Sequence, residues 1–328
     1  MSDLKKELLK RREIFNERLK VFLDRGKPKV LYDAARHLPL AGGKRLRPVL
    51  SMVSCEAVNG DVETVIPVAL AIELMHNFTL VHDDIMDKSN LRRNKPSVHV
   101  EYDEPTAINA GDLLFTLSFE SMHQIKKDLT VFKELEYNLI NTVREICEGQ
   151  QLDMQFEKEK IIDEDSYLEM IRKKTAVLFE FSTMSGGLIG GGSKKEVSAL
   201  KDYGRYLGLA FQIHDDYLDM SSDEEKLGKD IGNDIRNRKK TLIAVHCLNN
   251  AENEDRKVLD KYFGNKNASS EEVKKIYNVF KNTGSIDYAK KKAVQYHDIA
   301  REKLDFLSDS SVKEVLFDLI DFSISRKK

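Results

Sequence analysis

The sequence predicts an all-α protein, and two observations support that prediction. All six prolines lie at or before Pro105, so the longer remainder of the 328-residue chain lacks the residue that most often breaks a helix. Apolar residues also recur at helical spacing from the start of the chain, at Leu4, Leu8, Phe15, Leu19 and Phe22. Without a fixed repeat or a low-complexity linker, the chain is expected to form one domain, residues 1–328, as a single large helical bundle.

The same periodicity places the individual helices. One long, unusually apolar helix is predicted from Val65 to Met86, and Pro48 and Pro67 are expected at helix starts because the first turn tolerates proline. The glycines between Gly186 and Gly192 lack the context of a phosphate loop, which favours a helix end with close packing before it. Further helices are predicted near 106–126, 130–158, 164–188, 194–220, 239–249, 270–282 and 285–307.

The composition excludes several classes of function. Lysine and arginine (53) nearly balance aspartate and glutamate (55), so no basic field that would attract nucleic acid is expected. The cysteines, Cys55, Cys147 and Cys247, are too few and too widely spaced for a disulfide framework or a zinc site. The charged amino-terminal segment lacks the apolar run of a signal peptide, and no later segment offers about 18 uncharged apolar residues. A cytoplasmic protein without stable membrane insertion is therefore expected.

Two DDxxD motifs are the main candidates for chemistry: Asp83, Asp84 and Asp87, and then Asp215, Asp216 and Asp219. Residues four apart share a helix face, so the first and last aspartates of each motif form a carboxylate pair. Apolar sequence surrounds both motifs, and a cation would offset the repulsion of such carboxylates in an interior cavity. Magnesium suits this donor set, since it usually takes one or two carboxylates together with waters and substrate phosphates.

Two other interpretations of these motifs fit the sequence less well. A single DDxxD is more often a solvated acidic face of a helix, but two copies in apolar sequence favour metal binding. A di-iron site would need Glu-x-x-His helices, and neither Glu145 nor Glu148 has a histidine three residues later. His82 and His214, which precede the aspartate pairs, are expected to be structural residues.

Basic residues lie close to the first aspartate motif. Lys44, Arg45 and Arg47 follow Gly42 and Gly43 in GGKRLRP, where flexible backbone and cations together could clamp a phosphate. Arg92 and Arg93 follow the first motif directly, and their guanidinium groups could bind phosphate oxygens or pair with the aspartates.

The ordered set of motifs resembles the polyprenyl synthetase family of trans-isoprenyl diphosphate synthases, most closely the archaeal short-chain geranylgeranyl and farnesyl diphosphate synthases. The resemblance covers about residues 40 to 245 and comprises GGKRLRP, LMHNFTLVHDDIMDKSNLRR, EGQQLD, Lys174-Thr175, and GLAFQIHDDYLD followed by LGKDIGNDIRNRKKT. It implies a helical bundle around a deep central cavity, usually in a homodimer. It also implies magnesium-dependent condensation of isopentenyl diphosphate with an allylic diphosphate.

The resemblance assigns a role to individual residues of this sequence. It implies two to three magnesium ions, which manganese could replace, held by Asp83, Asp87, Asp215 and Asp219. It implies that isopentenyl diphosphate is bound by Lys44, Arg47, His76 and Arg93. The allylic substrate would be bound by Arg92, Lys174, Thr175, Gln212, Lys229 and Lys239, and the supporting carboxylates would be Asp84, Asp153, Asp216 and Asp234. The sequence departs from the family pattern at Asn94, where glycine is common, and at Ala176, which would add a methyl group near the allyl site.

Product length is expected to depend on a bulky residue below the first motif. Ile72, Met75 and Phe78 are three residues apart and would form one stripe along a helix, with Phe78 as the floor of the cavity. The choice of Phe78 rests on the family, because an aromatic residue five positions before the motif resembles the archaeal geranylgeranyl synthase pattern. This implies mainly a twenty-carbon product with a fifteen-carbon companion. The alternative is that Phe78 is an ordinary core residue.

Two other functions would use similar residues. A class I terpene cyclase or head-to-head synthase shares an aspartate-lined helical cavity but needs no clamp for isopentenyl diphosphate. A non-catalytic partner subunit of a prenyl synthase would commonly lack aspartates from one motif, whereas both motifs are complete in this sequence.

Overall fold

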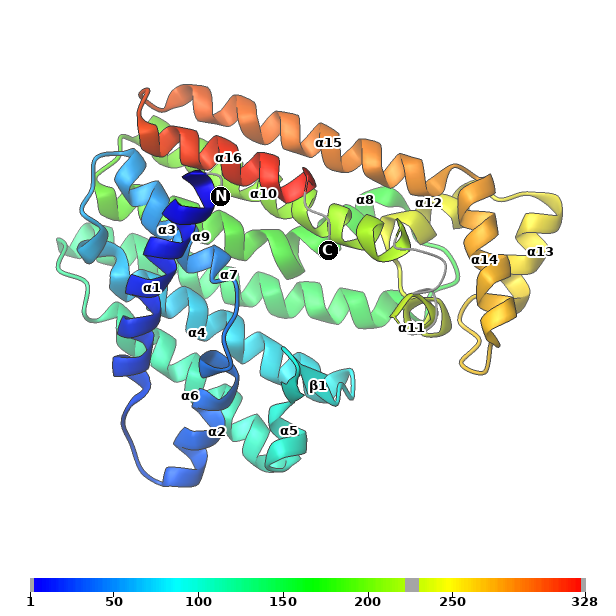
Figure 1. Ribbon diagram of the computed structural model, residues 1–328, viewed down its shortest axis with the longest axis horizontal. Helices are drawn as coiled ribbons and strands as arrows, with labels where there is room; N and C mark the ends of the chain where they lie inside the picture. The colour runs from blue at the N-terminus through cyan, green and yellow to red at the C-terminus, as the bar shows by residue number, and fades with distance from the viewer. Residues whose placement is uncertain (1–2, 222–229, 326–328) are drawn as a thin grey trace. The chain divides into compact units, whose positions relative to one another are not determined.

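The computed structural model describes residues 3–221 and 230–325, and most of this part of the chain is helical (Figure 1). Within those residues the only sheet is an antiparallel pair of two-residue strands, β1 (Leu91–Arg92) and β2 (Lys95–Pro96). The prediction of an all-α fold is confirmed.

The chain divides into two compact units, each of which combines segments that are distant in the sequence. Unit 1 comprises Met1–Val143, Phe181–Lys201 and Leu304–Leu316. Unit 2 comprises Arg144–Glu180, Asp202–Lys303 and Phe317–Lys328. Four of the five boundaries fall inside helices, namely α7 (Leu129–Phe156), α9 (Val177–Gly190), α10 (Lys194–Ser221) and α16 (Ser311–Ser325). The expectation of a single domain stays a prediction.

Unit 1 is organised around one long helix, α4 (Val62–Met86), which packs against both α3 and α6. Most side chains of α4 are buried on every side, as expected for a helix whose sequence is apolar all round. The other helices that lie wholly in this unit are α1 (Asp3–Leu23), α2 (Lys29–Leu40), α3 (Leu46–Ala57), α5 (Val98–Glu101) and α6 (Glu104–Met122).

The start of α4 differs from the prediction. Pro67 does not begin the helix but lies in its second turn, while Pro48 lies in the first turn of α3 as predicted. Asp61 sets the earlier start, because its side chain accepts a hydrogen bond from the backbone of Glu63 at 3.0 Å and so caps the helix. Pro67 is tolerated there since it removes one backbone donor near a helix end.

Helix α4 also bears on the expected absence of membrane insertion. Within residues 3–221 and 230–325, it alone is long and apolar enough to cross a membrane, and 67% of its most apolar window is buried inside the protein. The core helix of a globular protein has this same character.

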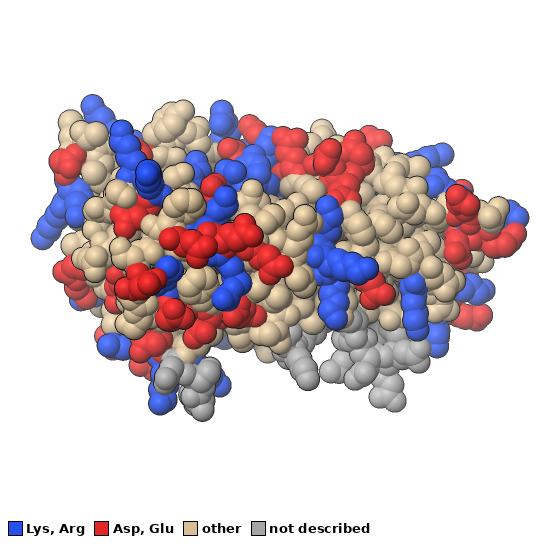
Figure 2. Space-filling view, turned by 90° about the horizontal axis from the view of Figure 1, so that it is seen from above, with Lys and Arg blue, Asp and Glu red and all other residues tan. Residues whose placement is uncertain are grey.

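The distribution of charged side chains and the state of the cysteines bear on the predictions drawn from composition. On the face drawn in Figure 2, acidic and basic side chains form small interspersed groups rather than an extended area of one sign. Cys55, Cys147 and Cys247 are free thiols, as predicted.

Unit 2 buries a core that includes Tyr167, Leu242, Ile276 and Phe280. The helices predicted near 194–220 and 270–282 are confirmed as α10 and α14. The helix predicted over 164–188 is interrupted by a π-helical turn, and the one predicted from 239 begins only after Thr241, which caps it. The helices that lie wholly in this unit are α8 (Glu164–Ile171), α11 (Asp230–Arg236), α12 (Leu242–Asn250), α13 (Asn253–Tyr262), α14 (Ser270–Asn282) and α15 (Ser285–Lys303).

The glycine-rich segment ends a helix, as predicted. Helix α9 stops at Gly190, and Gly191 adopts the left-handed backbone conformation with φ of +82°. One turn earlier, Gly186 lies against α3, and a Cβ atom there would stand 2.2 Å from the carbonyl oxygen of Ser51. The glycines therefore allow α9 to pack closely against α3 in unit 1.

A buried ion pair joins four segments of unit 1. Arg45, at the start of α3, is only 5% exposed, and its Nη1 lies 2.5 Å from Oε1 of Glu73 on α4, which is 2% exposed. Its Nε donates to Asn16 of α1 at 2.9 Å, and its Nη2 donates to the carbonyl of Pro39 of α2. Arg45 is therefore a structural residue, and its expected place in the phosphate clamp is wrong because its side chain points into the core.

Replacing Glu73 with glutamine should lower the free energy of unfolding by about 3 to 5 kcal/mol, because the Arg45 guanidinium would remain buried without its counter-charge. The matched control is Arg18→Gln, which removes an exposed ion pair to Glu63 of 2.8 Å and should cost no more than about 1 kcal/mol. Urea unfolding measures both values. Equal costs for the two variants would contradict the role given to the buried pair.

Candidate active site

The first DDxxD motif occupies the last turn of α4 in unit 1. Asp83 is partly buried, and Asp87 is exposed at the C-cap, where its backbone N–H still donates to the carbonyl of Asp83 at 2.8 Å. The helical geometry thus continues through Asp87, and these two aspartates share one face of the helix. The motif therefore presents a carboxylate pair four residues apart, as the sequence predicts.

The middle aspartate of this motif has a different environment. Asp84 is buried, and Arg92 of β1 binds its Oδ1 with Nε at 2.7 Å and Nη2 at 2.6 Å. Burial raises the pKa of Asp84, and the bond to Arg92 opposes that rise. Arg92 thus lies beside the motif, and in this structure its guanidinium is paired with Asp84.

The hairpin between β1 and β2 directs Arg93 away from the aspartates. Arg93 and Asn94 both have positive φ, 54° and 61°, as a tight hairpin turn requires of its two central residues. Asparagine tolerates this conformation better than most residues, which explains physically why it can stand where the family commonly has glycine. Arg93 reaches the GGKRLRP segment, donating to the carbonyls of Leu38 at 3.2 Å and of Gly42.

A cationic group forms where this segment meets the middle of α4. Nη1 of Arg47 lies 3.4 Å from Nε2 of His76. Burial lowers the pKa of His76 well below its ordinary value, and the positive charges of Arg47 and Arg93 lower it further, so the imidazole is neutral near pH 7. Lys44 is exposed, and its ammonium has no ion-pair partner within the part of the chain that the structure describes. The structure thus brings Arg47, His76 and Arg93 together, with Lys44 on the adjoining loop.

Aromatic side chains surround the predicted cavity floor. Ile72 and Met75 are fully buried, whereas Phe78 is partly buried and makes an edge contact with His82 at 4.9 Å between ring centroids. Phe78 also packs on Phe115 of α6 at 5.3 Å. His82 is hydrogen-bonded to the carbonyl of Ile108 at 3.2 Å, which confirms its predicted structural role.

The aromatic partners of Phe78 were not predicted from the sequence. Phe115 packs in turn on Phe119 at 5.1 Å, so three rings form a continuous aromatic row from α4 into α6. The spacing of Phe115 and Phe119, four residues apart on one helix, was the available signal, but their proximity to α4 is a tertiary contact.

The second DDxxD motif lies on α10 in unit 2, where its middle aspartate is again held by protein partners. Tyr167 donates its hydroxyl to Oδ2 of Asp216 at 3.1 Å, and Gln212 donates to Oδ1 at 3.0 Å. Burial raises the pKa of Asp216 to about 7, against the opposing effects of the Gln212 bond and of the nearby charge of Lys239. Asp234 is also close enough to raise this pKa.

Tyr167 is a functional candidate that the sequence analysis missed. Burial raises the pKa of its phenol well above the ordinary value, so the hydroxyl stays protonated and can only donate to Asp216. Tyr167 lies seven residues before Lys174, two turns along the predicted helix, which was the only available sequence signal. We regard it as a positioning residue for the second motif.

A π-helical turn carries the predicted Lys174-Thr175 pair. The turn spans Arg172–Ala176 between α8 and α9, and such widened turns are frequent at functional sites. Nζ of Lys174 pairs with Oδ2 of Asp153 at 2.5 Å, and the hydroxyl of Thr175 donates to Oε1 of Gln212 at 3.1 Å. Thr175, Gln212 and Asp216 therefore form one hydrogen-bonded chain.

Ala176 lies at a close contact between two helices. It is fully buried and packs against Gly208 of α10, where a Cβ atom would stand 2.8 Å from the methyl carbon of Ala176. The methyl group therefore fills a contact between two helices, and the expectation that it lies near the allyl site stays a prediction. Gly149, in EGQQLD, allows an equally close approach, since a Cβ there would stand 2.3 Å from the backbone nitrogen of Lys174.

The remaining predicted cations follow α11. The backbone N–H of Lys239 donates to the carbonyl of Asp234 at 2.9 Å, and the charge of Lys239 acts on Asp216. Lys229 lies outside the described residues. The next residue, Lys240, is buried, and its Nζ donates to the carbonyls of Phe156 at 2.9 Å and Glu159 at 2.7 Å. Burial lowers the pKa of Lys240 to about 8.

The donor set of each motif fits magnesium. Within the described residues, no group of three or more histidine, cysteine, aspartate or glutamate side chains is gathered closely enough to hold an ion by itself. Magnesium does not require such a group, because it completes its octahedral shell with waters and substrate phosphates. A pair of carboxylates four residues apart is therefore sufficient on the protein side.

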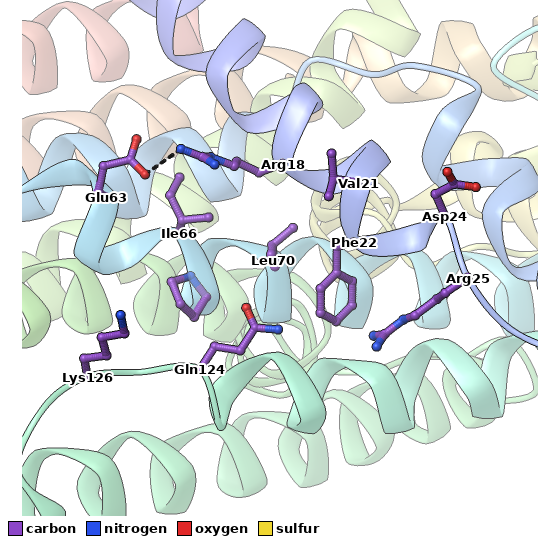
Figure 3. A pocket seen from close by; sticks show the side chains of 11 residues that line it. Arg18, Val21, Phe22, Asp24, Arg25, Glu63, Ile66, Leu70, Gln124 and Lys126 are labelled. Atoms are coloured by element: carbon purple, nitrogen blue, oxygen red, sulfur yellow. Dashed lines mark hydrogen bonds and ion pairs between the residues drawn. The ribbon is translucent and has the colours of Figure 1, made fainter.

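A groove of about 600 Å³ in unit 1 contains none of the predicted site residues (Figure 3). Phe22, Ile66 and Leu70 form its apolar side, and the ion pair between Arg18 and Glu63 crosses one end. Its character is that of a mixed surface groove.

Comparison with known proteins decides the family. The family model described as polyprenyl synthetase matches residues 28–280. The chain belongs to the polyprenyl synthetase family. The predicted resemblance is therefore confirmed, and members of this family of prenyltransferases are generally magnesium-dependent.

Archaeal members of the polyprenyl synthetase family are similar over nearly their whole length. A short chain isoprenyl diphosphate synthase of Methanothermobacter thermautotrophicus is 43% identical over 320 residues, covering 98% of both chains. A geranylgeranyl diphosphate synthase of Methanosarcina mazei is 43% identical over 302 residues, covering 92% of this chain and 91% of the relative. The crystal structure of geranylgeranyl pyrophosphate synthetase from Pyrococcus horikoshii superposes with a TM-score of 0.93 at 40% identity, covering 99% of this chain and 100% of that one.

The neutral His76 of this polyprenyl synthetase should make its stability sensitive to acid. The pKa of His76 is lower in the folded than in the unfolded protein, so its contribution is complete above about pH 6.5 and is lost as the pH falls, by up to about 1.4 kcal/mol per pH unit. His76→Gln should therefore lose less stability than the wild type between pH 7.5 and pH 5. Urea unfolding across this range measures the difference, and a difference that does not change with pH would contradict the assignment.

Proposed function

We propose that this polyprenyl synthetase joins isopentenyl diphosphate head to tail to allylic diphosphates, with geranylgeranyl diphosphate as its main product and farnesyl diphosphate as a companion. The observation that carries the proposal is the presence of two complete DDxxD motifs together with a cationic group of Arg47 and Arg93 around a neutral His76, with Lys44 on the adjoining loop. The names of the archaeal relatives support the product class.

The cationic group supports binding of a diphosphate without metal. Guanidinium groups match phosphate oxygens in pairs, and the carbonyls of Leu38 and Gly42 hold Arg93 in place before any ligand arrives. A neutral His76 can accept a hydrogen bond from Arg47 and so orient it without adding repulsion. A class I terpene cyclase or head-to-head synthase would have no use for this group.

The aspartate pairs are proposed to hold magnesium. Asp83 with Asp87, and Asp215 with Asp219, would bind two to three ions, for which manganese could substitute. When bound, magnesium supplies positive charge that stabilises the leaving diphosphate. A non-catalytic partner subunit would have no need to retain both motifs complete.

The chain's own residues would prepare the allylic substrate for ionisation. Lys174 and Lys239, with Arg92, would take up negative charge on the leaving diphosphate, so the allylic carbon–oxygen bond can break toward a delocalised cation. Gln212, held between Thr175 and Asp216, would turn its amide dipole toward that cation without forming a bond to it.

The second half of the reaction needs no base from the protein. The double bond of isopentenyl diphosphate attacks the allylic carbon, forming the new carbon–carbon bond and moving the positive charge to the neighbouring carbon. A proton then leaves the adjacent carbon and goes to an oxygen of the departed diphosphate, which restores a double bond. The apolar sequence around both motifs would exclude the water that could otherwise trap the cation.

Product length is proposed to depend on the aromatic row of Phe78, Phe115 and Phe119. Each condensation lengthens the apolar tail by one five-carbon unit, so growth stops where the tail meets a wall that cannot move. The rings of α4 and α6 pack in tilted and edge-to-face contacts, so they support one another and form a stiffer wall than Phe78 alone.

We also propose a cytoplasmic homodimer. Ile108 of α6 is 42% exposed, and Tyr137 and Ile140, three residues apart in the first half of α7, are 68% and 51% exposed. Large exposed apolar side chains are typical of protein interfaces. A second copy of the same chain is the proposed occupant.

The condensation is tested by incubating the purified protein with magnesium, labelled isopentenyl diphosphate and allylic primers. Asp83→Ala and Asp215→Ala should each lower turnover by about three orders of magnitude or more, with an unchanged circular dichroism spectrum, because each removes a proposed metal carboxylate. Asp305→Ala, at an exposed aspartate, is the control and should retain turnover.

Variants of the cationic group separate the proposal from its alternatives. Lys44→Gln and Arg47→Gln should raise the KM for isopentenyl diphosphate more than that for the allylic primer. Equal effects on both substrates would argue against two separate diphosphate sites. Turnover that survives exhaustive chelation of divalent ions would overturn the mechanism.

Phe78→Ala, and separately Phe115→Ala, should shift the products beyond twenty carbons if the aromatic row is the wall. If these rings are only core, each change should cost about 3 to 5 kcal/mol of stability without altering the products. Phe280→Ala, in the core of unit 2, is the control, with the same kind of stability cost and unchanged products. Chromatography of the prenyl products gives the answer, and folded, active variants with wild-type products would rule out the wall.

A further inference from the structure

Unit 2 contains a basic cavity that the proposed reaction does not use. It has a volume of about 350 Å³, and one wall is formed by the buried side chains of Leu248, Leu259 and Phe263. The charged residues that line it come from the loop after α7, the loop after α11, and α13: Lys160, Arg238, Arg256 and Asp260. Three cations therefore face one carboxylate, which leaves an excess of two positive charges.

Arg238 is fixed in position by its backbone contacts. It adopts a left-handed conformation with φ of 58°, and its Nε and Nη2 each donate to the carbonyl of Phe263 at 3.3 Å. The guanidinium lies over Gly264, where a Cβ atom would stand 2.3 Å from Nε of Arg238. Only glycine leaves room for this arrangement, and Gly264 also has a positive φ of 86°.

Arg256 is fixed in a similar way. Its Nη1 donates to the carbonyl of Leu248 at 2.8 Å, and its Nε pairs with Asp260 at 3.2 Å. A guanidinium has five N–H donors, so Arg238 and Arg256 each have donors beyond those that anchor them. Lys160 is exposed, and within the described residues its ammonium has no ion-pair partner.

We propose that this cavity binds inorganic diphosphate at a site separate from the two DDxxD motifs. Two anchored guanidinium groups and an ammonium can bind several oxygens of a phosphate compound, and the prior anchoring of the two guanidinium groups lowers the entropy cost of binding. A ligand with a single negative charge would balance only one of the two excess positive charges in the cavity. None of the lining residues is assigned to a substrate or metal of the condensation, so this binding does not depend on the proposed function.

The backbone connects this cavity with a predicted substrate residue. The consecutive cations Arg238, Lys239 and Lys240 point in three directions: into the cavity, toward the surroundings of Asp216, and into the core. The buried Lys240 binds the carbonyl of Glu159, the residue before Lys160, and so joins the two loops that supply cations to the cavity. A diphosphate bound there would hold both loops, and with them the segment that carries Lys239.

Hydrogen exchange of the full-length protein, with EDTA present to remove metal, tests the site locally. Inorganic diphosphate should slow amide exchange in α13 and in the loops around Lys160 and Arg238. The double variant Arg238→Gln/Arg256→Gln should weaken this protection by about tenfold or more, because charge-assisted hydrogen bonds are lost. Lys257→Gln is the control on the same helix, since Lys257 is exposed, pairs with Glu254 and does not line the cavity.

A third variant tests the site even if the double variant does not fold. Lys160→Gln changes an exposed loop residue and should weaken protection in the same segments without lowering the melting temperature. Equal protection in the wild type and in these variants would overturn the proposal, as would protection confined to the segments of Lys44, Arg47 and Arg93. Inorganic phosphate or geranyl diphosphate binding as tightly as inorganic diphosphate would overturn the assignment of the ligand.

Discussion

The arrangement of unit 1 depends on the buried contact between Arg45 and Glu73. A buried guanidinium must be paired and hydrogen-bonded, so Asn16, Pro39 and Glu73 fix where α1, α2 and α4 meet the start of α3. Because Arg45 is turned inward, the residues beside it are free to serve a different purpose: Lys44 faces solvent, and Arg47 reaches His76. Arg45 has no direct part in binding, but its buried side chain fixes the positions of Lys44 and Arg47, which are proposed to bind substrate.

In both DDxxD motifs, the middle aspartate differs in its contacts from the first and last aspartates. In each, the protein binds the middle aspartate, through Arg92 at Asp84 and through Tyr167 and Gln212 at Asp216. The first and last aspartates share a helix face, which is the arrangement that two ligands of one cation need. The partner of the middle aspartate is a cation in unit 1, whereas two neutral donors hold it in unit 2, where burial also raises the pKa of Asp216 to about 7.

The long periodic helices and the DDxxD motifs could be predicted from the sequence because both are local patterns. Two helices gave no such pattern and were not predicted. Helix α2 follows Pro28 and contains Pro39, and α13 has the mostly charged sequence NEDRKVLDKY. Sequence could not separate Arg45 from Lys44 and Arg47, since only the left-handed backbone turns that one side chain inward. Tyr167 and Phe115 were missed because their importance lies in contacts between helices.

The π-helical turn at Arg172–Ala176 also has a consequence for the history of this chain. Such a turn equals an α-helix with one inserted residue, and each residue of an α-helix advances the side chains by about 100°. A single inserted codon can thus turn the side chains of Lys174 and Thr175 to a new direction while both flanking helices keep their own packing. In an ancestral helix one residue shorter, the same pair would have pointed elsewhere, so the proposed use of this segment in substrate binding is separable from its use as structure.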